Sequence, residues 1–193
     1  MLEELRTNEL SPKQYYELNL QVLENLYFLQ SWFTLRVASS GSGGEEALVD
    51  LYQRVQYSTH AVPRMYLMLT VGACYVQSHK ARNGGRDVMR DMLEMCKSVQ
   101  NPARGLFMRN YLSQVVKDHV ALLGGPTEQA DFLLQNFAEM AKLWMRMVKK
   151  SEEGAQQLGQ LVGQNLTRLS EFSLEIYSQL IYPDLPQFVL QVM

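Results

Sequence analysis

Three histidines and two cysteines are the residues of this chain best suited to metal binding or nucleophilic catalysis. His60, His79 and His119 each lie near the end of an expected helix, without a carboxylate, cysteine or second histidine at ligand spacing. Cys74 and Cys96 lie inside helical patterns, and their spacing fits no metal site. We therefore expect surface or capping histidines and buried thiols, as in an intracellular protein, and we predict neither enzyme activity nor a metal or cofactor.

Phosphate and nucleic acid are the next ligands that the sequence could bind. Asn83-Gly84-Gly85-Arg86 is rich in glycine but lacks the lysine and the preceding strand of a phosphate loop, so a turn is the better interpretation. A basic group at 146–150 ends an expected helix, where cations suit the helix dipole. The net charge of −2 and the pI near 5.9 give no general attraction to nucleic acid, and we expect no nucleic-acid partner.

The composition is that of a folded protein. Hydrophobic residues make up 47% and charged residues 20% of the 193 positions, which argues against disorder. No apolar run approaches the roughly 18 residues that a membrane span needs. The N-terminal sequence has no basic stretch followed by an apolar segment, so we predict no secretory signal.

Apolar residues recur at three- and four-residue spacing through most of the chain, which predicts an all-α protein. The expected helices cover residues 12–37, 45–59, 63–79, 86–99, 102–122, 128–149, 152–170 and 172–181. Glycine and proline mark short connections near 83–85 and 123–127, and the serines and glycines of 38–44 predict a flexible loop. Successive antiparallel helices with short loops favour one α-solenoid domain of HEAT-like helix pairs over 1–193. A compact helical bundle is the alternative.

The segment Pro-Arg-Met-Tyr-Leu at 63–67 opens one of these helices. Proline suits the first turn of a helix, and Met65 shares one face with the apolar residues that follow. Arg64 and Tyr66 lie where side chains can reach outward. Arg64 could donate several hydrogen bonds to a partner, or form an ion pair between helices of the chain itself, and the sequence does not decide between these roles. Tyr66 has the chemistry of an interface anchor.

Four further blocks accompany this segment. They are Glu-Leu-Arg-Thr with Leu-Ser-Pro-Lys in 4–13, Val-Asp-Leu-Tyr at 49–52, Arg-Gly-Leu-Phe-Met-Arg-Asn-Tyr-Leu at 104–112, and Asn-Phe-Ala-Glu-Met at 136–140. Together and in this order, the blocks resemble the N-terminal region of the large scaffold subunit of retromer, the vacuolar protein sorting-associated protein 35 family. The resemblance covers most of residues 3–170.

The resemblance implies an α-solenoid without enzyme activity, whose N-terminal end docks the arrestin-like subunit of retromer. The family motif Pro-Arg-Leu-Tyr-Leu is tied to that partner, and it maps onto Pro63, Arg64, Met65, Tyr66 and Leu67. Methionine replaces the middle leucine at nearly the same volume. We add Arg109, from the block at 104–112, to the expected partner-binding residues. We predict that Arg64→Ala abolishes partner capture while the fold stays intact.

Other partners follow from the same resemblance. A phox-homology sorting nexin, cargo tails and a Rab-type small GTPase are expected near this end. The small phosphoesterase-like subunit of retromer is expected at the far end of the longer family proteins. The implied location is the cytosolic face of endosome membranes, in transport to the Golgi or the plasma membrane. Another helical adaptor or small-GTPase effector of membrane traffic is the alternative.

Overall fold

A computed structural model describes residues 1–7, 9–78, 84–123 and 125–149, and the structural statements below concern these residues. Six α-helices and several short 3₁₀ helices make up this part of the chain, and it contains no strand. The elements are η1 (Leu2–Arg6), α1 (Pro12–Ser40), α2 (Ser42–Val55), α3 (Ala61–Gln77), α4 (Gly85–Met95), η3 (Cys96–Ser98), α5 (Pro102–Val116), η4 (Lys117–Leu123) and α6 (Pro126–Lys149). The all-α prediction is confirmed. The helices expected at 152–170 and 172–181 lie outside the described residues.

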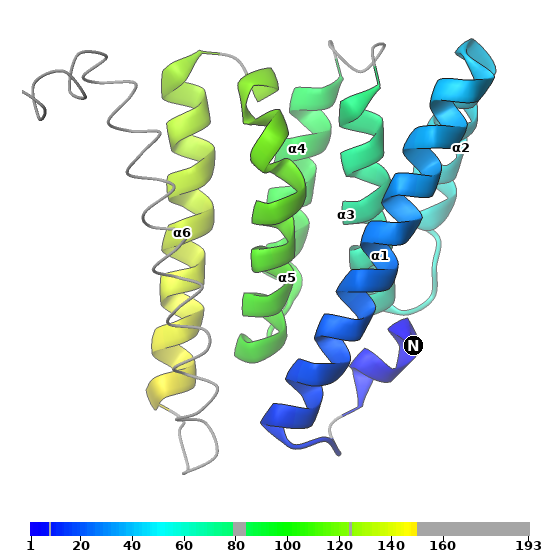
Figure 1. Ribbon diagram of the computed structural model, residues 1–193. Coiled ribbons are helices and arrows are strands. Elements are labelled where there is room, and N and C mark those ends of the chain that lie inside the picture. The colour runs from blue at the N-terminus through cyan, green and yellow to red at the C-terminus, as the bar shows by residue number, and fades with distance from the viewer. Residues whose placement is uncertain (8, 79–83, 124, 150–193) are drawn as a thin grey trace, which may run out of the picture.

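The six helices are arranged as three successive pairs, α1 with α2, α3 with α4, and α5 with α6 (Figure 1). The first helix of each pair contacts the first helix of the next, so α3 packs against both α1 and α5. Stacked pairs of this kind are compatible with the predicted helical solenoid. The side chains that face inward form one main core around α3.

Two helices begin where the sequence predicted, because their first residues carry capping signals. Ser11 precedes α1, its Oγ accepts a hydrogen bond from the Gln14 N–H, and the Gln14 Oε1 accepts one from the Ser11 N–H. This reciprocal pair is a capping box. The side chain of Asn101 accepts a hydrogen bond from the Arg104 N–H at the start of α5. In both helices a proline follows at a position whose N–H is not needed.

The flexible loop predicted for 38–44 is wrong. The helix α1 continues to Ser40 and α2 begins at Ser42, so Gly41 alone separates them. Gly41 has a φ of +57° and a ψ of −134°, a conformation that side-chain-bearing residues rarely adopt. A Cβ on Gly44 would lie 2.9 Å from the Cα of Val37. The small residues therefore allow a tight reversal and a close helix contact rather than flexibility.

Methionine fills much of the core. Seven methionines of the described residues are buried, namely Met65, Met68, Met89, Met92, Met108, Met140 and Met147. Their flexible thioether chains fit irregular spaces between helices. A Cβ on Gly72 would lie 2.8 Å from the sulfur of Met92, which shows how closely α3 and α4 approach at that point.

Candidate partner-binding site

The segment Pro63–Leu67 lies in the first two turns of α3, and its side chains divide between the core and the surface. The helix begins at Ala61, so Pro63 still falls within the first turn, where backbone N–H groups have no helical partner. Pro63 and Met65 are buried, and Tyr66 is 1% exposed. Arg64 and Leu67 are half-buried. Only these two of the five side chains remain in part accessible to another protein.

Tyr66 connects three helices inside the chain. Its hydroxyl donates a hydrogen bond of 3.0 Å to the Oδ1 of Asn19 in α1, and its ring centroid lies 5.8 Å from that of Tyr111 in α5. The Thr70 hydroxyl donates to the Tyr66 carbonyl and lies 2.8 Å from the Tyr111 hydroxyl. Burial raises the pKa of Tyr66 well above its usual value. These contacts correct the expectation that Tyr66 is a surface anchor.

Arg64 holds the connection between α2 and α3. Its Nη1 donates a hydrogen bond of 3.1 Å to the backbone carbonyl of Ser58. Within the described residues it forms no ion pair with a carboxylate, so the alternative of a helix-to-helix ion pair is not found there. The N–H groups of Tyr57 and Ser58 bond to carbonyls of the last turn of α2. The guanidinium therefore joins the start of α3 to a loop that continues α2.

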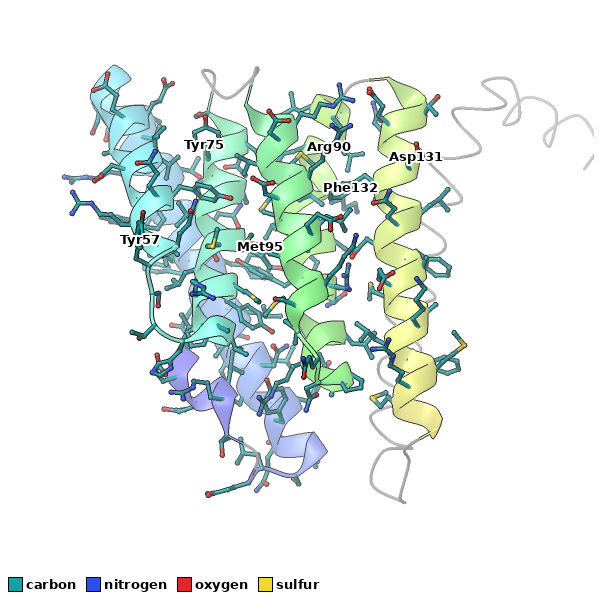
Figure 2. All side chains as sticks on the ribbon, turned by 180° about the vertical axis from the view of Figure 1, so that it is seen from behind. Tyr57, Tyr75, Arg90, Met95, Asp131 and Phe132 are labelled. Carbon is teal, nitrogen blue, oxygen red and sulfur yellow. The ribbon has the colours of Figure 1, made fainter. Side chains whose placement is uncertain are left out.

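Tyr57 is the most exposed large hydrophobic residue in the described part of the chain, with 87% of its side chain accessible. It lies on this same connection, at the outer edge of the helices in Figure 2. The Nε2 of His60 lies 3.7 Å from a carboxylate oxygen of Glu3, which brings η1 beside the connection. We refer to residues 56–60 together with Arg64 and Leu67 as the α2–α3 corner. It presents one aromatic ring, one arginine and a half-buried leucine.

Arg109, expected among the partner-binding residues, lies in the interior. The side chain is 1% exposed, and its Nη1 donates a hydrogen bond of 3.0 Å to the Oδ1 of Asn136 in α6. The Nδ2 of Asn136 donates to the hydroxyl of Ser113 at 2.7 Å. The Nε of Arg109 has no hydrogen-bond partner, and desolvation lowers the pKa of its guanidinium. Arg109 thus fixes α5 against α6.

Sequence reasoning missed the two asparagines that satisfy these buried groups. Asn19 is 2% exposed and Asn136 is 1% exposed. A signal was present for Asn136, because Phe132 and Met140 lie four residues before and after it on the apolar face of α6. A polar residue on such a face predicts a buried hydrogen bond, although it does not name the partner.

The buried thiols agree with the sequence prediction. Cys74 and Cys96 are free and buried, and burial raises the pKa of Cys74 to about 11 and that of Cys96 to about 12. Both remain protonated at neutral pH and are poor nucleophiles. The described residues contain no group of three or more His, Cys, Asp or Glu side chains placed to hold a metal ion. None of the described helices combines the length and the hydropathy that a membrane span requires.

The comparisons with known proteins agree with the resemblance that the five sequence blocks carry. The family model described as vacuolar protein sorting-associated protein 35 matches residues 1–193. The chain is 39% identical to vacuolar protein sorting-associated protein 35B of Arabidopsis thaliana over 95% of its length. It is 36% identical to the Dictyostelium discoideum protein of the same family over 95%, and 38% identical to the Schizosaccharomyces pombe protein over 91%. It spans about a quarter of the length of these relatives, between 22% and 25%. The chain therefore belongs to the vacuolar protein sorting-associated protein 35 family.

Proposed function

We propose that this chain belongs to a non-enzymatic scaffold subunit of retromer and docks the arrestin-like subunit at the α2–α3 corner. Family membership supports the role in vacuolar protein sorting. The observation that carries the proposed site is the bond from Arg64 to the Ser58 carbonyl, beside the exposed Tyr57. Through this bond the family motif contacts an exposed connection, although most of the motif's side chains point inward.

The proposed mechanism is presentation of a preorganised surface. The buried network around Tyr66 fixes α3 against α1 and α5, and Arg64 then fixes the connection at the end of α2. A surface that is already ordered loses little conformational entropy on binding. Tyr57 would supply buried area, because an exposed tyrosine is a typical interface anchor. Arg64 uses one of its five N–H donors on Ser58, which leaves donors for carbonyl or carboxylate groups of the partner.

Co-purification with the arrestin-like retromer subunit tests the proposal. We expect the wild-type chain to capture the subunit, and Tyr57→Ser and Arg64→Ala to reduce capture about tenfold or more. Phe28→Ser is the matched control, because it removes a 76% exposed aromatic side chain from α1, outside the corner. Equal capture by all four proteins would contradict the site. No capture by a wild-type chain with native circular dichroism would contradict the docking function.

Further partners and the cellular location belong to the same proposal. We propose that a phox-homology sorting nexin, cargo tails and a Rab-type small GTPase bind close to this end of the scaffold, on the cytosolic face of endosome membranes. Each is tested by adding the purified component to the chain already bound to the arrestin-like subunit. Capture of the GTPase by the chain alone, with no capture of the arrestin-like subunit, would favour the alternative of a GTPase effector.

A further inference from the structure

The outward face of α1 carries one row of side chains that the core does not use. Glu24, Phe28, Trp32 and Arg36 follow one another at intervals of four residues, and residues so spaced form a continuous ridge on a helix. Phe28 is 76% and Trp32 48% exposed, and both charged residues are exposed. In Figure 1, α1 lies in front of α2, and Trp32 and Arg36 line one side of a groove whose other side is formed by α2 residues, among them Leu48 and Leu51. The order along this ridge is acidic, aromatic, aromatic, basic.

Among the described residues, the two charged ends of the ridge have no partner of opposite charge. The guanidinium of Arg36 lies 5.8 Å from the centroid of the Trp32 ring, and no carboxylate within the described residues pairs with it. Glu24 likewise forms no ion pair in this part of the chain. Leu35, which is 71% exposed, flanks the aromatic pair. Apolar area of this kind on a helix face indicates a contact surface.

We propose that the ridge binds the ridge of a second copy of this chain, with the two α1 helices antiparallel. A two-fold axis beside Gln30 pairs the two copies so that the numbers of two facing residues add up to sixty. Phe28 then faces Trp32 of the second copy, and Glu24 faces Arg36 of the second copy. Each of these contacts occurs twice, as a two-fold interface requires.

The packing geometry of helices allows this arrangement. Rows of residues four apart pack beside each other when two helices cross at about 50°. Near the crossing point lies Ser31, whose small exposed side chain permits close approach. Offset stacking of aromatic rings and the two ion pairs would supply the attraction. A second copy is the partner that the ridge favours. In the antiparallel orientation, its ridge presents an aromatic residue opposite each aromatic residue and a charge of opposite sign opposite each charge.

A single helix face is smaller than a standard interface, so we expect weak, concentration-dependent association. Sedimentation equilibrium should show the chain largely monomeric at about 5 µM and substantially dimeric at about 500 µM. Added salt should weaken the dimer because the ion pairs are exposed. A wild-type chain that stays monomeric over this whole range would overturn the proposal.

Charge reversal tests the pairing itself. Glu24→Arg and Arg36→Glu each place like charges opposite each other, and each should raise the dissociation constant about tenfold or more. The double variant carries Glu24→Arg and Arg36→Glu in the same chain, which restores both ion pairs between the two copies. Its dissociation constant should return to within about threefold of the wild-type value. Asp91→Arg, on the exposed face of α4, is the matched control and should leave association unchanged. A double variant as weak as the single variants would overturn the antiparallel register.

Cross-linking tests the orientation by a separate readout. A mixture of Glu24→Cys and Arg36→Cys chains should form a disulfide between unlike chains under mild oxidation, because the two thiols would face each other. Either variant alone should cross-link about tenfold more slowly, because like positions lie at opposite ends of the ridge. The native thiols of Cys74 and Cys96 are buried and do not compete. Equal cross-linking in the mixture and in the separate samples would contradict the antiparallel arrangement.

Discussion

The hydroxyl of Tyr66 in α3 donates a hydrogen bond of 3.0 Å to the side-chain oxygen of Asn19 in α1, and both residues are buried. The two residues are 47 positions apart in the sequence. This bond places the tyrosine of the family motif inside the helix array. The motif therefore combines one residue that holds helices together with another, Arg64, that orders an exposed connection. Loss of partner binding in a motif variant can accordingly arise from lost stability or from a lost surface.

Replacing Tyr66 by phenylalanine separates these two causes. The variant keeps the ring but leaves the Asn19 oxygen without its donor, and an unsatisfied buried acceptor costs about 1–3 kcal/mol. We expect the free energy of unfolding in urea to fall by about that amount, while partner affinity per folded molecule stays unchanged. Tyr57→Phe is the control, because its exposed hydroxyl should contribute little. Unchanged stability together with lost binding would instead make Tyr66 a contact residue.

The two partners of the α5–α6 hydrogen bond should differ in the cost of their removal. Asn136→Leu leaves the buried Arg109 cation without its acceptor, and we expect a loss of about 3 kcal/mol or more. Arg109→Met removes the charge along with its desolvation cost and leaves only a neutral oxygen unsatisfied, so we expect about 1–2 kcal/mol. Urea unfolding of both variants provides the comparison. The reverse order would mean that the charge on Arg109 is stabilised by groups other than Asn136.

Alkaline pH should destabilise the fold through its buried thiols. A thiol with a usual pKa of 9.0 has a pKa of about 11 at Cys74 and about 12 at Cys96 in the folded chain. As the pH rises above 9, the unfolded chain loses these protons first, so stability that is complete below pH 9 declines towards pH 11–12. Each thiol contributes a slope of about 1.4 kcal/mol per pH unit.

Unfolding in urea at a series of pH values measures that slope. Cys96→Ala should remove the contribution of one thiol to the slope between pH 9 and about 12. Cys74→Ala should do the same between pH 9 and about 11. A decline of equal steepness in wild type and in both variants would show that other groups cause it.

Two glycines near the end of α1 provide a test of the structure of residues 38–44. Gly41→Ala forces a side chain into a positive φ and should destabilise the chain by about 1–2 kcal/mol. A Cβ on Gly43 meets no atom within 4 Å, and Gly43→Ala should stabilise α2 by up to about 0.5–1 kcal/mol. Thermal unfolding of both variants checks the pair. If both substitutions were neutral, the segment would be a flexible loop after all.

Local signals predicted the helices well because they act over a few residues. Ser11 with Pro12 and Asn101 with Pro102 mark the starts of α1 and α5, and the structure places those starts at the prolines. The composition of 38–44 was misleading for a physical reason. Serine and glycine permit flexibility, but they equally permit two helices to approach closely, and only the position of the neighbouring helix decides between these outcomes.

The direction of the side chains of Tyr66, in the motif, and of Arg109, outside it, could not be predicted from the sequence. Tyr66 and Arg109 carry polar groups that are equally suited to a surface and to a buried network. Their partners, Asn19 and Asn136, lie 47 and 27 positions away. Hydrogen bonds at such separations depend on how helices pack, which local spacing does not specify. The position of the motif was predicted by resemblance, but its division into buried and accessible residues required the fold.

Titration calorimetry of this chain into the arrestin-like retromer subunit tests the central claim most directly. We predict saturable binding at a ratio of one to one. Tyr57→Ser should weaken it about tenfold or more, with the melting temperature unchanged. Absence of binding by the folded wild-type chain at about 100 µM would contradict the docking function. Equal affinity of wild type and Tyr57→Ser would contradict the α2–α3 corner as the site.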